Sequence, residues 1–278
     1  MMRPRPSDWL STAAPPQVMG IVNINDDSFS GDGSLDPEVA IGQALAMQAA
    51  GADIIDLGAE SARTNRAAIS IAEEIARLQP VIAALKASPT PPLISVNTWR
   101  PEVAAEILPM GIDLLNDIGA LPDDRNARLC AQHGCALLIM HSVGLPKVAQ
   151  TQQEYDDVWD AMLRFFEAKI AIAEAAGLAR EKIVLDPGID FAKQREHNLA
   201  VYRELDRLRG FGLPILLPVS RKTVIGEVLG IDRPAERDAG TVACIVAGLR
   251  RGAKLFRVHN VAAAKQALQV ITPLLPPP

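Results

Sequence analysis

Short apolar runs recur eight times along the chain, and each run stops at a polar or charged residue. The runs with their stops are Val18–Val22 at Asn23, Ile54–Ile55 at Asp56, Leu93–Val96 at Asn97, Leu114–Leu115 at Asn116-Asp117, Ala136–Met140 at His141, Ile183–Leu185 at Asp186, Ile215–Val219 at Ser220-Arg221-Lys222, and Leu255–Phe256 at Arg257. We interpret these runs as strands, and the segments between them have helical patterns.

The predicted helices follow the strands in order. They are Pro37–Ala50, Ile71–Ala87, Pro101–Leu108, Asp123–Gln132, Asp157–Ala176, Asn198–Leu208, Arg237–Arg250 and Val261–Ile271. Pro80 lies inside the second of these, so a kink or a break is expected there. Eight alternating strand–helix units predict a single (β/α)8 TIM barrel, in which the active site lies at the C-terminal ends of the strands.

Length and composition agree with one barrel domain. The chain has 278 residues, of which 49% are hydrophobic and only 4% aromatic, so a large aliphatic core is expected. No proline- or serine-rich linker divides the middle of the chain. We therefore expect a barrel at residues 17–272, a flexible segment at 1–16 and a flexible tail at 273–278.

Charge and cysteine usage narrow the class of protein. A net charge of −5 argues against a broad nucleic-acid surface, although a few local cations could still bind a small anion. The sequence has no run long enough to cross a membrane and no apolar signal-peptide core near residue 1. Three irregularly spaced cysteines argue against a disulfide framework, and Cys130 and Cys135 have poor spacing for a metal site. We expect a protein of the reducing cytoplasm.

Cationic residues gather after the last two predicted strands. Arg257 and His259 alternate in an extended segment and therefore face the same side. An arginine fork beside an imidazole suits an oxyanion such as phosphate, which barrels often bind near strands seven and eight. Lys222 closes strand seven, and Arg63 could add a cation from the far rim. Each alone could be a solvated surface cation, but their convergence favours anion binding.

Polar residues at three other strand ends suggest a hydrogen-bonding floor. Asn97, Asn116 and Asp186 end strands three, four and six, so their side chains are expected in the barrel mouth. A carboxylate flanked by carboxamides can hold a planar ring with an amidine-like or guanidine-like edge. Each Asn could equally be a cap of its strand, whereas Asp186 begins an Asp-Pro-Gly turn that would aim the acid. His141, which ends strand five, is interpreted as a rim residue.

Ten short motifs occur in order along most of the chain. They are Met19-Gly20-Ile21-Val22-Asn23, Asp27-Ser28-Phe29-Ser30, Gly51-Ala52-Asp53-Ile54-Ile55-Asp56, Glu60-Ser61-x-Arg63, Ser95-Val96-Asn97-Thr98, Asn116-Asp117, Met140-His141, Asp186-Pro187-Gly188-x-x-Phe191, Ser220-Arg221-Lys222 and Arg257-Val258-His259. Each motif is weak alone, but the set at barrel spacing resembles the pterin-binding family, and within it the enzymes that make dihydropteroate. The resemblance runs from about Val18 to Ile271.

The resemblance implies an activity and a set of site residues. The activity is a transferase step of folate biosynthesis, the condensation of 6-hydroxymethyl-7,8-dihydropterin pyrophosphate with p-aminobenzoate, with release of pyrophosphate. The implied contacts are Asn97, Asn116, Met140, Asp186, Lys222 and Arg257 for the pterin, Asn23, Arg63, Arg257 and His259 for pyrophosphate, and Phe191, Ser220 and Lys222 for p-aminobenzoate. Lys222, Asp186 and Arg257 would be catalytic, and Asn23 would help bind Mg²⁺. The resemblance also implies a homodimer and a target of sulfonamides, which mimic p-aminobenzoate.

The chain departs from the family pattern in its substrate-handling loops and at one pterin position. Asn97 replaces an acid of the third strand, so it brings no negative charge to balance a developing cation. The other departures are Asn25-Asp26 for Thr-Pro, Ala62 for Thr, Thr64-Asn65 for Pro-Gly, and Gly188-Ile189-Asp190-Phe191-Ala192-Lys193 for Gly-x-Gly-Phe-Gly-Lys. Two alternative functions stay open. A pterin-dependent methyl-transfer domain would not need the retained cations, whereas a pterin-binding paralogue without synthase activity would fit Asn97 and Ala62.

Overall fold

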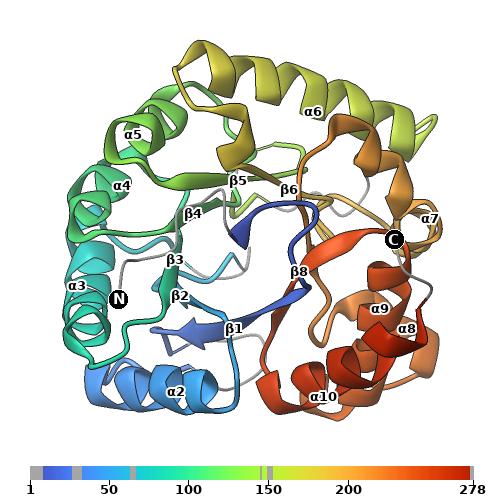
Figure 1. Cartoon of the computed structure of the whole chain (residues 1–278). Coiled ribbons are helices and arrows are strands. Elements are labelled where there is room, and N and C mark those ends of the chain that lie inside the picture. Colours follow the sequence, from blue (N-terminus) through green and yellow to red (C-terminus); the bar gives the residue numbers. More distant parts are fainter. Residues whose placement is uncertain (1–8, 27–32, 63–66, 145, 149–152, 276–278) are drawn as a thin grey trace.

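Eight parallel strands close into a barrel in chain order. The computed structural model describes residues 9–26, 33–62, 67–144, 146–148 and 153–275. The strands are β1 (Gln17–Asn23), β2 (Ile54–Gly58), β3 (Leu93–Asn97), β4 (Leu114–Asp117), β5 (Ala136–Met140), β6 (Ile183–Asp186), β7 (Ile215–Pro218) and β8 (Ala253–Val258). Because β8 also pairs with β1, the ring is closed, and the predicted (β/α)8 architecture is confirmed (Figure 1).

Helices surround the strands on the outside of the barrel (Figure 1). They are α2 (Pro37–Ala49), α3 (Ile71–Ala87), α4 (Pro101–Ile107), α5 (Arg125–His133), α6 (Val158–Ala175), α7 (Arg195–Arg203), α8 (Thr223–Leu229), α9 (Asp238–Arg250) and α10 (Val261–Ile271). A kink or a break was expected at Pro80, and the break is wrong because α3 continues through this residue. Pro80 and Ala76, whose carbonyl loses its helical partner, are both exposed, so water can take the place of that hydrogen bond.

Two further helical predictions need correction. The segment predicted as Asn198–Leu208 begins earlier, as α7, and then changes into a 3₁₀ helix at Leu205–Phe211. The short helix α8 was not predicted at all, because its seven residues follow directly on the polar end of β7. It contains Gly226, where a Cβ atom would lie 2.5 Å from the guanidinium of Arg237.

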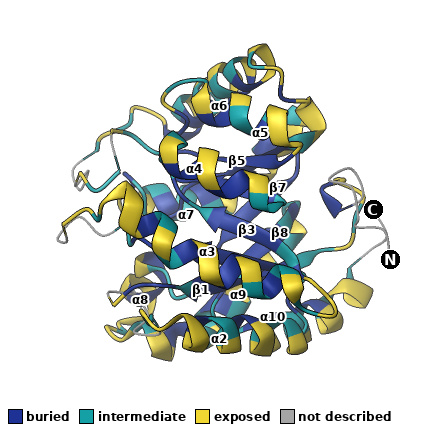
Figure 2. Ribbon diagram, turned by 90° about the vertical axis from the view of Figure 1, so that its left-hand side faces the viewer, coloured by how far each residue is buried: buried dark blue, intermediate teal, exposed yellow. Residues whose placement is uncertain are grey.

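The core has two layers, one inside the barrel and one between strands and helices. Inside the barrel, side chains such as Met19, Leu114 and Leu255 pack together with Trp9 and Leu10. Figure 2 shows the buried strands enclosed by helices whose outward faces are exposed. Trp9 is 6% exposed and its carbonyl accepts a hydrogen bond from the Gln17 side chain, so residues 9–10 close the barrel at the N-terminal ends of the strands. This part of the segment predicted as flexible is therefore packed, whereas residues 1–8 lie outside the described chain.

Strand register places the polar strand ends in one layer at the mouth. Asn23 pairs with Gly58, Gly58 with Asn97, and Asn97 with Asn116. The second apolar run predicts a strand that stops at Asp56, but β2 continues to Gly58. Asp56 therefore lies one layer below the mouth, with its side chain inside the barrel.

Candidate active site

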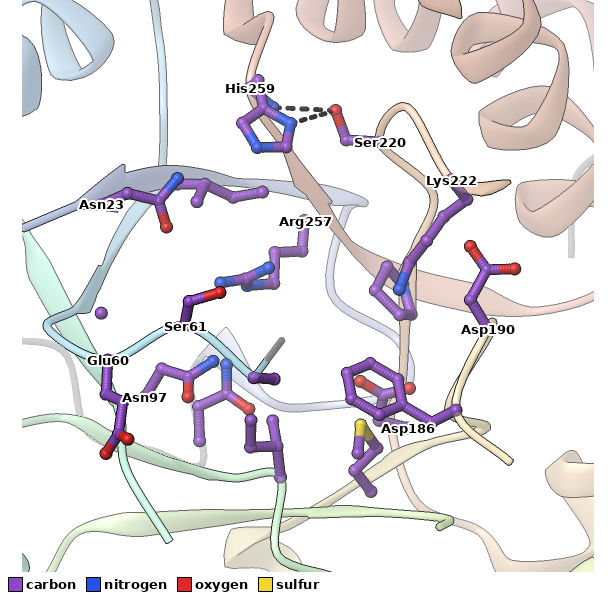
Figure 3. Close-up of a pocket in the computed structure, with 18 of the residues that line it drawn as sticks. Asn23, Glu60, Ser61, Asn97, Asp186, Asp190, Ser220, Lys222, Arg257 and His259 are labelled. Atoms are coloured by element: carbon purple, nitrogen blue, oxygen red, sulfur yellow. Dashed lines mark hydrogen bonds between the residues drawn. The ribbon is translucent and has the colours of Figure 1, made fainter. Parts of the chain in front are cut away.

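A cavity of about 310 Å³ opens at the C-terminal ends of the strands. It is lined by ten of the eleven residues that the sequence analysis assigned to the site, namely Asn23, Asn97, Asn116, Met140, Asp186, Phe191, Ser220, Lys222, Arg257 and His259. Arg63, the eleventh, lies outside the described residues. Figure 3 shows the labelled members of this set facing a common space. The predicted residues thus meet in one place, although their roles remain predictions.

Asp186 is held rigidly at the floor of the cavity. It is 3% exposed, and its Oδ1 accepts a 2.7 Å hydrogen bond from the Gly188 backbone N–H. Gly188 has a φ of 66°, and a Cβ atom there would lie 2.0 Å from the His141 carbonyl oxygen, so only glycine fits this turn. Burial raises the pKa of Asp186 to about 6, against the lowering effect of that N–H and of Lys222 and Arg257. The acid is therefore mostly ionised at neutral pH and becomes protonated as the pH falls through about 6.

Two amide carbonyls in the same cavity as Asp186 have unmet hydrogen-bonding capacity. The Oδ1 atoms of Asn97 and Asn116 are buried and accept no hydrogen bond from any described residue. A buried polar atom without a partner costs roughly 1–3 kcal/mol, so both atoms favour a ligand or water that donates to them. Together with the Asp186 carboxylate they present acceptors to a planar ligand with several N–H donors.

A buried ion pair fixes Arg257 from below. Its Nε donates to Asp56 Oδ2 at 2.6 Å, and Asp56 is fully buried. The Ser95 hydroxyl donates to Asp56 Oδ1 at 2.5 Å, and the Asn116 amide lies 3.2 Å from Oδ2. Asp56 is a functional residue that is absent from the predicted site, where its position as a strand stop gave it no role. The alternation of Ile54, Asp56 and Gly58 with Ile55 and Leu57 was the signal that the acid points into the barrel.

His259 and Ser220 join the ends of the last two strands. The Ser220 hydroxyl lies 2.7 Å from His259 Nδ1 and accepts a 3.1 Å hydrogen bond from the His259 backbone N–H, as Figure 3 shows. His259 and Arg257 both line the cavity, as their alternation predicted. Arg221 instead bonds to Asp238 at 2.8 and 3.2 Å, so the Ser220–Lys222 tripeptide sends Lys222, and not Arg221, into the cavity.

Lys222 bridges the end of β7 and the loop that follows β6. Its Nζ donates to the Ile189 carbonyl at 2.7 Å and lies 5.0 Å from the centre of the Phe191 ring. Burial lowers the pKa of Lys222, and the carboxylates of Asp190 and Asp186 oppose that shift. The amine is therefore held in position beside the aromatic ring before any ligand arrives.

A buried lysine stabilises the loop that carries Phe191. Lys193 Nζ donates to the carbonyls of Gly188 and Phe191, each at 3.1 Å, and lies 2.8 Å from His141 Nδ1. Burial lowers the pKa of Lys193 to about 7, and burial together with Lys193 lowers that of His141 to about 2. His141 is thus a neutral acceptor. It anchors the loop and does not line the cavity.

The donor chemistry at β1 suits a weakly ligated Mg²⁺ ion. No group of three or more His, Cys, Asp or Glu side chains within the described ranges could hold a metal by itself. Mg²⁺ usually keeps several waters and takes one or two protein oxygens together with substrate phosphates. The Asn23 side chain lines the cavity and supplies an oxygen of this kind, so the residues fit such an ion. All three cysteines are free, and none of the described helices could span a membrane.

Known proteins match both the sequence and the fold. The family described as pterin binding enzyme matches residues 19–259. The dihydropteroate synthase of Escherichia coli K12 is 40% identical over 257 residues, which are 92% of this chain and 90% of the relative. A Yersinia pestis dihydropteroate synthase in complex with a sulfonamide drug has a TM-score of 0.88 at 37% identity and 94% coverage of each chain. A Xanthomonas albilineans dihydropteroate synthase in complex with 7,8-dihydropteroate has a TM-score of 0.83 at 34% identity, covering 97% of this chain and 96% of that one. The chain therefore belongs to the dihydropteroate synthases of the pterin-binding enzyme family.

Proposed function

We propose that the cavity condenses 6-hydroxymethyl-7,8-dihydropterin pyrophosphate with p-aminobenzoate to give 7,8-dihydropteroate and pyrophosphate. One observation carries the proposal: a floor of unsatisfied acceptors at Asn97 and Asn116, with the buried acid Asp186, shares one cavity with the cationic residues Lys222 and Arg257. The floor matches the N–H-rich edge of a pterin. The cations match a substrate that also carries an anionic leaving group.

The floor residues would bind and orient the pterin. Asp186 accepts two N–H bonds from the guanidine-like edge, while the carbonyls of Asn97 and Asn116 accept others. Met140 contributes an apolar surface beside the ring, because it lies next to Asp186 across the β5–β6 pair. These contacts hold the exocyclic CH₂ group at a fixed place above the floor, which reduces the entropic cost of the reaction.

The opposite side of the cavity would hold the leaving group. Arg257 and His259 bind the pyrophosphate, and Arg63, which lies outside the described residues, is predicted to add a cation. Asn23 would hold Mg²⁺, which when bound neutralises charge that develops on the departing pyrophosphate. Because Asp56 fixes Arg257 in place, the guanidinium need not reorganise as charge develops, and this is the condition for efficient electrostatic catalysis.

The reaction would be a substitution at carbon with a loose transition state. The bond between the exocyclic carbon and the pyrophosphate oxygen breaks, and the oxygen keeps the electron pair. The neutral amine of p-aminobenzoate then forms the new C–N bond and loses a proton. Phe191, Ser220 and Lys222 shape the arylamine pocket, and no covalent intermediate with the protein is needed.

Pyrophosphate release tests the proposal directly. The purified chain is mixed with the pterin pyrophosphate and Mg²⁺, with and without p-aminobenzoate, and both pyrophosphate and dihydropteroate are measured. We expect release that depends on the amine. Tight pterin binding without release would instead identify a non-catalytic pterin-binding paralogue, the alternative that the amide Asn97 favours.

The assembly and compartment remain separate predictions. We propose a homodimer in the reducing cytoplasm, supported by the family membership and by the three free cysteines. Light scattering coupled to size-exclusion chromatography measures the mass in solution. A mass near 29.8 kDa, that of one chain, contradicts the dimer.

A further inference from the structure

An acidic side chain lines the arylamine side of the cavity. Asp190 lies in the loop between β6 and α7 and is one of the lining residues, together with its neighbour Phe191 and with Lys222 and Thr223. In Figure 3 its carboxylate lies beside the Lys222 side chain. The proposed reaction gives this acid no role, and p-aminobenzoate brings a carboxylate of its own to the same part of the cavity.

The backbone at Asp190 is one that favours glycine. Its φ is +67°, and Ala192, two residues later, has a φ of +48°. The motif that this loop resembles has glycine at both places. A non-glycine residue in the left-handed region costs roughly 1–2 kcal/mol, although Asp tolerates it better than most residues. The chain thus has a carboxylate at a position whose backbone conformation favours glycine.

Hydrogen bonds hold the carboxylate in one orientation. Its oxygens accept from the backbone N–H groups of Thr223 at 2.5 Å and Val224 at 3.3 Å, and from the Asn198 side chain at 3.2 Å. The Asn198 carbonyl in turn accepts from the Asp190 backbone N–H at 2.9 Å. The negative charge is therefore fixed at the rim of the cavity.

The orientation of the arylamine in the cavity brings its para substituent to this rim. Its amine must face the reacting carbon above Asp186, so the group para to the amine points outward, to the part of the cavity lined by Asp190 and the exposed Thr223. Lys222 would attract a carboxylate there, but it is already close to two acids. Of these, Asp190 acts on Lys222 more strongly than Asp186.

We propose that Asp190 is a specificity-determining residue that disfavours an anionic para group on the arylamine and favours an uncharged one. The inference rests on the proposed function and refines its substrate class: p-aminobenzoate is accepted against a local negative charge, while neutral arylamines of the same shape are not penalised. Repulsion between two carboxylates in a partly buried site changes an affinity by roughly tenfold.

Two substitutions separate charge from loop structure. Asp190→Asn keeps the shape and one hydrogen-bond acceptor but removes the charge, whereas Asp190→Gly removes both and relieves the left-handed backbone. Asp206→Asn is the matched control, because Asp206 is an acid paired with Arg251 and does not line the cavity. For each protein, kcat and KM are measured with p-aminobenzoate and with the neutral 4-aminobenzamide, at saturating pterin pyrophosphate and Mg²⁺.

We expect the ratio of kcat/KM for p-aminobenzoate to that for 4-aminobenzamide to rise about tenfold in both Asp190 variants, mainly through a lower KM for p-aminobenzoate. The ratio should stay constant in Asp206→Asn. An unchanged ratio in both Asp190 variants, with activity retained, overturns the inference and leaves Asp190 as a cap of α8 alone. A wild-type chain that releases no pyrophosphate with either amine is a different result, which removes the proposed function and this inference with it.

Discussion

The floor and the cationic side of the cavity are prepared for their ligands in opposite ways. On the floor, the carbonyls of Asn97 and Asn116 are buried and unsatisfied among the described residues. On the cationic side, Arg257 is bonded to Asp56 and Lys222 to the Ile189 carbonyl. The floor therefore gains hydrogen bonds when a ligand arrives, whereas the cations already have partners.

This difference indicates where recognition and where catalysis reside. Unsatisfied acceptors discriminate strongly, since a ligand without matching donors leaves them buried and unpaired at a cost of roughly 1–3 kcal/mol each. Fixed cations add less to ground-state affinity, because part of their charge is already neutralised. Arg257 is, however, in place when charge develops on the leaving group. Changes on the floor should act on pterin binding, and changes on the cationic side on turnover.

The largest effect is expected on the cationic side, from Lys222→Ala. Lys222 is a cation held in the pocket from which the arylamine attacks, and loss of such a positioned group lowers kcat by roughly 10²–10³. Stopped-flow measurement of pyrophosphate release tests this, with Lys182→Ala as control because Lys182 donates to the carbonyl of the exposed Gly134 and does not line the cavity. Turnover within a factor of two of the wild type would show that the assignment of Lys222 is wrong.

The next largest effect is expected from Asp56→Asn, which removes the negative charge that pairs with Arg257 but keeps the shape of the side chain at position 56. We expect kcat to fall by roughly 10–100-fold and the free energy of unfolding to fall by about 3 kcal/mol, because Arg257 loses its buried counter-charge. Denaturant melts measure stability, and Arg257→Met with the double variant completes a mutant cycle. Strictly additive effects of the two changes would contradict the coupling.

The sequence predicted which residues form the floor and the cationic side, but it did not predict the buried contacts that hold those residues in place. Asn97, Asn116 and Asp186 were found because barrel topology brings strand ends together, whatever their partners. Asp56 was not, because its role depends on Arg257, which lies 201 residues away along the chain. The helix α8 was not predicted for a similar reason. Its seven residues are too few to show a recognisable helical period, and the helix is stabilised by tertiary contacts such as the packing of Arg237 on Gly226.

A smaller effect is expected from pH acting on the floor. Burial raises the pKa of Asp186 to about 6, so below pH 6 the free protein holds the protonated acid, which has lost an acceptor and its charge. Affinity for 6-hydroxymethylpterin should be constant above this pH and fall toward tenfold per unit below it. Titration calorimetry between pH 7.5 and 5 measures this, and Asp186→Asn should bind weakly without pH dependence. The same slope in that variant would exclude Asp186 as the cause.

The smallest effect, and the sharpest test of the floor, is expected from exchanging each amide for an acid. Asn97→Asp adds a charge that can balance the cation developing on the pterin, so single-turnover rates should rise by up to about tenfold. Asn116→Asp has the same chemistry but lies 3.2 Å from Asp56, where a second carboxylate is repelled and buried. We therefore expect Asn116→Asp to lower the free energy of unfolding and the rate together. If both variants behave alike, the two amides are equivalent hydrogen-bonding groups, and the missing charge at position 97 does not limit the reaction.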